Sequence, residues 1–161
     1  MILGYFSTLL TRDLEAVIRE IEAYPDEASV WQTPPGINNS AGSLALHCAG
    51  NLHHFIGTVL GGSEYRRDRD AEFADRNLPK SEIVSRLRQA REAVEETLNR
   101  VSEKVLEGDF PEALGGHRQP AIRGLAHIAT HLAYHLGQVD YHRRMVTGQG
   151  PLKGILAAPK Q

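Results

Sequence analysis

The sequence predicts an all-α protein, an antiparallel four-helix bundle with long connections between the helices. Four segments repeat apolar residues at steps of three and four, which is the period of one face of an α-helix. No segment shows the alternation of apolar and polar residues that is typical of a half-buried strand, and no Asn-Gly or Asp-Gly hairpin occurs. Proline and glycine clusters separate the four segments, so each is expected to end where such a cluster begins.

The first two helices are predicted from their apolar stripes and their ends. The first covers about residues 3–23 and stops before Pro25, which cannot continue a helix. The second begins at a cap formed by Asn39 or Ser40 and runs to about Leu60, before a pair of glycines. The predicted stripes are Phe6, Leu10, Leu14, Val17 and Ile21 in the first helix, and Leu44, Cys48, Leu52, Phe55 and Val59 in the second.

The third and fourth helices follow a charged connection. Ser81 is predicted to cap the third helix, which is expected to extend to Gly108. Pro120 suits the first turn of the fourth helix, and Gly148 closes it. The predicted stripes are Ile83, Leu87, Ala90, Val94, Val101 and Val105 in the third helix, and Leu125, Ile128, Leu132, Leu136 and Val139 in the fourth.

The composition places the chain among soluble, globular proteins. Its 161 residues are enough for one domain, predicted over residues 1–150, with a C-terminal tail over residues 151–161. A net charge of -2 gives no sign of nucleic-acid binding. No apolar run is long enough to span a membrane, and the first residues do not resemble a signal peptide. A single cysteine, Cys48, excludes an internal disulfide and fits a cytoplasmic location.

A histidine pair in the stretch HLAYHLGQVDYHRR is the first candidate for a functional site. His131 and His135 are four residues apart, so both can point at one atom from the same helical face. A divalent metal ion held by two imidazoles needs at least one more ligand, and a bundle can supply it from a facing helix. The best candidate is His47, which lies on a polar stripe of the second helix. The alternatives are a chance pair or two hydrogen-bonded core histidines.

The other five histidines have weaker claims. His54 shares a face with His47 and could be a fourth ligand, although a place in a cleft or in solvent is expected. His127 precedes His131 by four residues and competes for the pair. His53 and His117 are expected at the surface, and His142 near a helix end, where the helix dipole favours a cation.

Three more side chains near the candidate ligands could contribute to the site. Asn51 and Gln138 could hold a metal-bound water or the outer nitrogen of a ligand, or could form interhelical hydrogen bonds. Cys48 is expected to be a buried structural thiol. No carboxylate shares the ligand stripes, and the charged run of residues 66–70 is expected to be a solvated loop.

Two segments carry a family resemblance: SAGSLALHCAGNLHHFIG in the second helix and HIATHLAYHLGQVDYHRR in the fourth. With the PPG loop before the second helix, they resemble the DinB/YfiT-like superfamily of predicted metalloenzymes. The resemblance implies an antiparallel four-helix bundle and one divalent metal held by three histidines, which are here His47, His131 and His135. It also implies a homodimer. Characterised relatives include transferases and isomerases that use low-molecular-weight thiols such as bacillithiol, mycothiol or glutathione.

Three imidazoles would leave a metal ion with an open position, as in catalytic sites. Zinc, nickel, iron and manganese all accept imidazole ligands. The leading hypothesis is a thiol-dependent S-transferase, in which the metal lowers the pKa of a bound thiol. The alternatives are a metal-dependent hydrolase and a non-catalytic dimer that binds a metal or ligand. The sequence has no HExxH motif with its glutamate base, and the lack of a carboxylate on the ligand stripes favours thiol activation.

The expected homodimer has one support in the sequence besides the resemblance. Leu46, Ile56 and Leu60 lie on the side of the second helix away from its predicted apolar stripe. If exposed, these side chains would suggest a partner surface. The alternative is that the long connection after Gly62 covers them.

Overall fold

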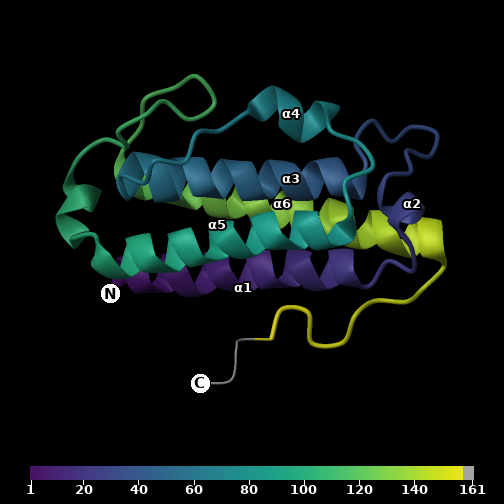
Figure 1. Ribbon diagram of the computed structural model, residues 1–161. Coiled ribbons are helices and arrows are strands. Elements are labelled where there is room, and N and C mark those ends of the chain that lie inside the picture. The colour runs from purple at the N-terminus through teal and green to yellow at the C-terminus, as the bar shows by residue number, and fades with distance from the viewer. Residues whose placement is uncertain (158–161) are drawn as a thin grey trace.

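The computed structural model confirms the all-α bundle (Figure 1). The structure describes residues 1–157, and within them no β-strand forms. The bundle helices are α1 (Ile2–Glu22), α3 (Ala41–Leu52) with its π-helical continuation η1 (His53–Leu60), α5 (Lys80–Arg100) and α6 (Ala121–Thr147). Two short helices, α2 (Glu27–Val30) and α4 (Arg69–Ala74), lie in the connections.

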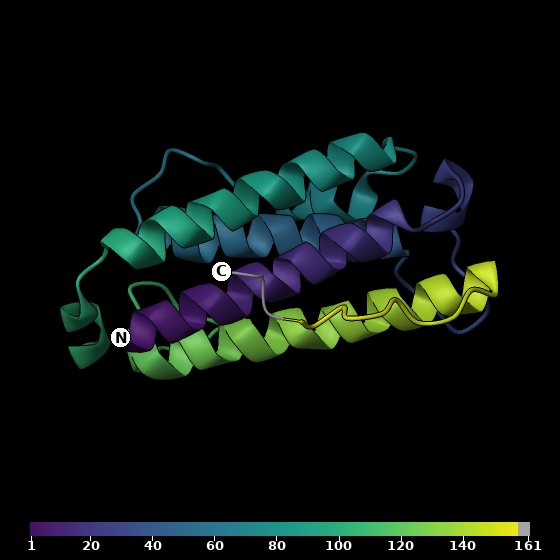
Figure 2. The ribbon, with the colours of Figure 1, turned by 90° about the horizontal axis from the view of Figure 1, so that it is seen from below.

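The four long helices form a ring in which each packs against two neighbours. Helices α1 and α6 run in one direction, and α3 and α5 run in the opposite direction (Figures 1 and 2). Helix α3 lies between α5 and α6, and α1 completes the ring between the same two helices. Because α3 and α5 run in the same direction, the chain between them has to return along the bundle. This return segment carries α4 over α3.

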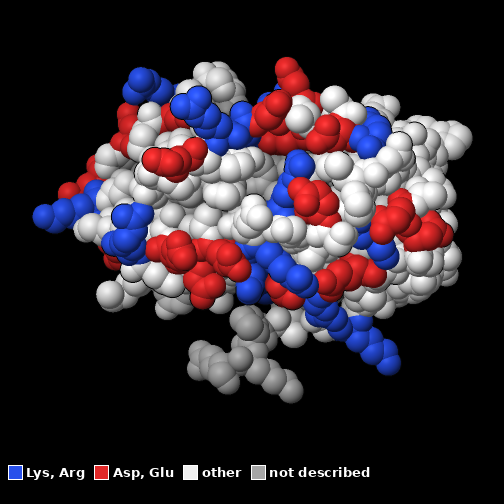
Figure 3. All heavy atoms as spheres, viewed as in Figure 1, with Lys and Arg blue, Asp and Glu red and all other residues white. Residues whose placement is uncertain are grey.

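The apolar stripes of the four helices meet in one core. Leu10, Leu52, Leu87 and Leu125 are examples, one from each long helix, and all four are fully buried. Burying a leucine side chain stabilises a fold by about 1.5–3 kcal/mol, so the stripes account for the assembly of the bundle. Acidic and basic side chains are mixed over the face shown in Figure 3. None of the helices in residues 1–157 has the length and apolar character that crossing a membrane requires.

The predicted second helix ends at Leu60 as expected, but its second half is π-helical. A π-helix has a wider turn than an α-helix and therefore rotates the buried face. Ile56 is 0% exposed, whereas Phe55 and Val59 of the predicted stripe are only partly buried. The predicted stripe therefore holds only in part in this half of the helix: Phe55 and Val59 pack against the core, but Ile56 is the residue that is fully buried.

Leu46 and Ile56 are buried and do not form the exposed apolar surface that would suggest a partner. Leu46 is 2% exposed and shares a small cavity with Tyr65 and Glu82, so the connection after Gly62 and α5 cover this side of α3. Leu60 is partly buried. The homodimer therefore stays a prediction that rests on the family resemblance.

The ends of α5 differ from the prediction for local reasons. The helix begins after Pro79 rather than at Ser81, because the Glu27 carboxylate accepts a hydrogen bond from the Lys80 backbone N–H at 2.6 Å. It ends at Arg100 rather than Gly108. There the Ser102 side chain caps a short 3₁₀ turn instead.

The start of the C-terminal tail is tied to the bundle. The Arg19 guanidinium donates hydrogen bonds to the carbonyls of Lys153 and Gly154, at 3.1 and 3.0 Å. Gly148 ends α6 with a φ of 69°, as the sequence predicts. Residues 153 and 154 of the predicted tail therefore contact α1, and its last residues, 158–161, lie outside the described part of the chain.

Trp31 closes one end of the bundle, and Gly42 makes room for it. The indole N–H donates to the Leu78 carbonyl at 3.1 Å, which fixes the ring. A Cβ atom on Gly42 would lie 2.7–2.9 Å from three atoms of that ring. We expect Gly42→Ala to lower the free energy of unfolding by about 1–3 kcal/mol, the usual range for overpacking. Chemical denaturation followed by circular dichroism measures this loss.

The control is Gly137→Ala in α6, where an added Cβ meets nothing within 4 Å. Replacing a helical glycine with alanine without a clash should stabilise the protein by about 0.5–1 kcal/mol. If both variants changed stability in the same direction, the packing of Trp31 on Gly42 would not have the importance assigned to it.

Candidate metal centre

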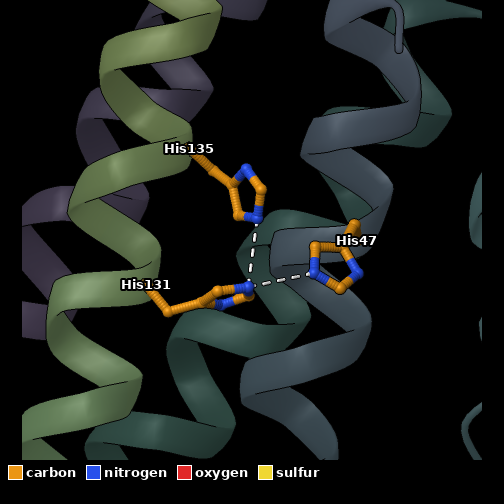
Figure 4. Close-up of side chains that lie close together, drawn as sticks. All are labelled: His47, His131 and His135. Atoms are coloured by element: carbon orange, nitrogen blue, oxygen red, sulfur yellow. Dashed lines mark hydrogen bonds between the residues drawn. The ribbon is translucent and has the colours of Figure 1, made fainter. Parts of the chain in front are cut away.

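Three histidines from two helices converge between α3 and α6 (Figure 4). His47 comes from α3, and His131 and His135 come from successive turns of α6. The Nε2 atom of His131 lies 3.4 Å from that of His47 and 3.1 Å from that of His135. One ring nitrogen from each residue lies within 4.8 Å of the others. The structure therefore brings together the three side chains that the sequence selected.

The spacing of these nitrogens fits a divalent metal ion. Two imidazole nitrogens that bind the same ion at about 2.0–2.1 Å are about 2.8–3.4 Å apart when the angle at the ion is 90–110°. The two Nε2–Nε2 distances, 3.1 and 3.4 Å, fall in this range. A set of three imidazoles is also chemically suited to zinc, nickel, iron or manganese. The site could therefore hold one such ion.

Hydrogen bonds at the outer nitrogens turn two of the three rings toward the centre. His47 Nδ1–H donates to Oε2 of Glu72 at 2.9 Å, and His135 Nδ1–H donates to Oε1 of Gln138 at 2.7 Å. Because carboxylate and amide oxygens only accept hydrogen bonds, Nδ1 carries the proton in both rings. The lone pairs of their Nε2 atoms are then free to bind a metal. Gln138 therefore holds the outer nitrogen of a candidate ligand, which is one of the two roles predicted for it.

Burial keeps the imidazoles of α6 in their neutral form. Burial, with smaller contributions from the neighbouring His135 and His47, lowers the pKa of His131 to about 4. Burial also lowers the pKa of His135, which the hydrogen bond to Gln138 partly opposes. At neutral pH both rings are therefore uncharged, which is the state that binds metals.

Glu72 is a residue of the site that the sequence analysis missed. It comes from α4, is 6% exposed, and accepts hydrogen bonds from Arg67 at 2.6 and 2.8 Å as well as from His47. Burial raises the pKa of Glu72, but the hydrogen bonds and charges of Arg67 and His47 outweigh it and hold the pKa below its usual value. The ligand stripes of α3 and α6 carry no carboxylate, as predicted, but α4 brings the Glu72 carboxylate to the site. The prediction of a solvated loop is wrong at Arg67.

Glu72 reaches His47 because Gly50 leaves space for it. A Cβ atom on Gly50 would lie 2.0 Å from Oε1 of Glu72. Asp68 caps α4 by accepting a hydrogen bond from the Ala71 N–H at 3.0 Å, which begins the helix just before Glu72. A helix of six residues is too short for an apolar period to show in the sequence.

Three of the remaining histidines stay outside the triad. The ring of His127 is exposed and stacks 6.1 Å from that of His131. His54 contacts the Glu112 carboxylate at 3.1 Å and turns away from the centre. His117 is exposed, as predicted.

Two other histidines differ from their predicted positions. His53, expected at the surface, is half-buried and stacks on Tyr65 with ring centroids 4.0 Å apart. His142 is buried: its Nε2–H donates to the Gln32 carbonyl at 2.8 Å, and its Nδ1 accepts from the Tyr24 hydroxyl at 2.7 Å. Burial lowers the pKa of His142, so the expected cation at the helix end is wrong.

Cys48 is a buried free thiol, as the sequence predicts. Burial, with a smaller contribution from the charge of Glu72, raises the pKa of this thiol to about 12. A thiol in this state has almost no thiolate at neutral pH, so Cys48 is not a nucleophile of the site.

One cavity borders the triad, and a second cavity near it has none of the three histidines in its wall. A polar cavity of about 310 Å³ includes His47 and His131 in its wall, together with Asn51, Arg67, Arg69 and His127 among others. A mainly apolar cavity of about 440 Å³ is bordered by side chains that include Ile37, Leu44, Gln138, Tyr141 and Met145. Gln138 connects this second cavity to the triad through its hydrogen bond to His135. The volume of each cavity is within or close to the range of small-molecule sites.

Comparison with known proteins identifies the family. The model of the DinB superfamily matches residues 9–139, a span that contains most of α1, all of α3 and α5, and the three histidines. No curated protein and no solved structure matches the chain. The chain therefore belongs to the DinB superfamily.

Proposed function

We propose that the protein binds one divalent metal ion through His47, His131 and His135 and acts as a thiol-dependent enzyme of the S-transferase type. One observation carries this proposal. The three ring nitrogens converge, and within residues 1–157 no fourth histidine, cysteine, aspartate or glutamate joins them. A structural site is usually closed by four protein ligands, whereas a catalytic site keeps a position for water or substrate.

Thiol chemistry fits the surrounding side chains better than hydrolysis does. A divalent ion at this centre would favour the deprotonated form of a thiol. Hydrolysis would need a base for the attacking water, but both oxygens of Glu72 are already engaged by Arg67 and His47. Since the Cys48 thiol is buried, the reacting thiol has to come from a cosubstrate.

The two cavities support a reaction with two organic substrates. The polar cavity has two of the three histidines in its wall, and the apolar cavity is bordered by Gln138, which is hydrogen-bonded to the third. An S-transferase has to bring a thiol and an electrophile together, whereas a hydrolase needs one organic substrate and water. A homodimer and a cytoplasmic location belong to the same proposal, on the family resemblance and the single reduced cysteine.

The first prediction concerns metal content. His131→Ala removes a central ligand, so the purified protein should fall from about one metal ion per chain to nearly none. Its helicity should persist, because the apolar stripes form the bundle. Elemental analysis and circular dichroism measure the two effects. His117→Ala is the control, since that side chain is exposed and outside the triad. An equal loss of metal in both variants would contradict the proposed ligand set.

The second prediction concerns Glu72. Glu72→Gln removes the charge that holds His47 and leaves Arg67 without its carboxylate. Metal affinity should therefore fall by roughly 10- to 100-fold, as for other residues that support a ligand. Competition with a chelating dye measures the affinity. Glu112→Gln, which changes the partner of His54 alone, is the matched control and should bind metal as the wild type does. Wild-type affinity in Glu72→Gln would show that Glu72 does not support the ligand.

The third prediction concerns thiol binding. A small thiol added to the cobalt-substituted protein should produce a sulfur-to-cobalt charge-transfer band. The band should titrate with an apparent pKa well below the thiol's usual value of about 8.5. It should be absent in His135→Ala. The metal-loaded protein should then accelerate the attack of the thiol on a generic electrophile.

Two other results would indicate a different function for the protein. A rate that needs the metal but no thiol, and rises as water is deprotonated, would indicate a hydrolase. The absence of both the band and any rate, across several natural thiols, would indicate a protein that binds metal without catalysis.

A further inference from the structure

Asn51 is a buried polar side chain whose oxygen has no partner. It lies one turn after His47 on α3, is 8% exposed, and borders the polar cavity. Its Oδ1 atom accepts no hydrogen bond from the described residues. Nearly all buried polar groups in native proteins have a partner, so this amide indicates one that the described chain does not supply. Rotation about its last torsion lets the amide present either its oxygen or its nitrogen to the cavity.

Arg69 provides an uncompensated positive charge in the same wall. Among the ion pairs of residues 1–157, none involves Arg69, whereas the nearby Arg67 is bound to Glu72. The guanidinium carbon of Arg69 lies 5.4 Å from the centre of the Phe73 ring, which supports the exposed side chain from one side. The five N–H donors of a guanidinium suit a carboxylate, which they can bind through two parallel hydrogen bonds.

We propose that the polar cavity recognises a cysteine-type thiol that carries an amide or amine and a free carboxylate. The inference rests on the proposed thiol function and adds the residues that select the thiol. In a cysteine derivative the sulfur, the nitrogen and the carboxylate are attached to neighbouring carbons. One such molecule can present its sulfur to the histidines, its nitrogen to Asn51 and its carboxylate to Arg69. A cavity of about 310 Å³ has room for a molecule of this size.

The test compares two probes that differ in the carboxylate alone: N-acetyl-L-cysteine and its primary amide. Their dissociation constants are measured from the charge-transfer band of the cobalt-substituted protein. We expect the carboxylate to bind at least about tenfold more tightly, as a charge-assisted hydrogen bond implies. Arg69→Met keeps an unbranched, mainly apolar side chain but removes its charge, and should abolish this preference without changing the affinity for the amide. Arg66→Met, in the wall of a different cavity, should retain the preference.

A second measurement tests Asn51 without a thiol. In the zinc-loaded protein, the side-chain amide signal of Asn51 is identified by its absence in the spectrum of Asn51→Leu, a variant of nearly the same shape. Adding N-acetylglycine, which has the amide and the carboxylate but no sulfur, should shift this signal in the wild type. The shift should be much smaller in Arg69→Met at the same concentration. An unchanged signal would mean that the amide is satisfied by water and would overturn the role of Asn51.

The outcomes separate the two proposals. Equal affinity of the wild type for the two thiols, or a preference that survives in Arg69→Met, overturns the recognition of a carboxylate and leaves the thiol function standing. If no thiol gives the band, the thiol function fails. N-acetylglycine then tests the recognition of the carboxylate by itself. A shift of the Asn51 amide signal that depends on Arg69 supports this recognition, and an unchanged signal overturns it.

Discussion

The axial register of α3 against α6 is the constraint on which the site depends. His47 belongs to one helix and His131 and His135 to the other, yet their Nε2 atoms lie 3.1–3.4 Å apart along the contacts through His131. Metal–ligand distances tolerate changes of about 0.2 Å, whereas one residue along a helix is a step of about 1.5 Å. A slip of one residue between the helices would therefore separate the ligands. The tightly packed apolar stripes prevent that slip, so the packing of the core also sets the geometry of the site.

The topology of the bundle adds the second layer of the site. Because α3 and α5 run in the same direction, their connection has to pass along the bundle, and this one carries α4 over α3 (Figure 1). It delivers Arg67 and Glu72 to His47, and Gly50 leaves the space that the Glu72 carboxylate fills. Changes in this connection can therefore alter the orientation of His47 while the core of the bundle stays as it is.

The sequence predicts the features that depend on regular helices. The four helices and the triad follow from apolar stripes and from an i, i+4 pair, because both express the regular α-helical turn. Where the turn changes, the prediction holds only in part: the π-helical segment buries Ile56 fully and Phe55 only partly. Glu72 is missed because it belongs to a six-residue helix and meets His47 through tertiary packing. The neutral state of His142 is missed because it depends on burial, which outweighs the helix dipole.

Two buried carboxylate–guanidinium pairs show how similar groups serve different purposes in this fold. Glu20 and Arg143 join α1 to α6, and Arg143 also donates to the Gly150 carbonyl, which fixes the chain after α6. Burial raises the pKa of Glu20 in spite of Arg143, and its Oε1 atom lacks a partner among the described residues. In Glu72 both oxygens accept hydrogen bonds and the pKa is lowered overall, so this carboxylate stays ionised at neutral pH. An anion at Nδ1 makes Nε2 of the same ring a better electron donor. The first pair therefore connects two helices of the bundle, whereas the second adjusts a ligand of the candidate metal centre.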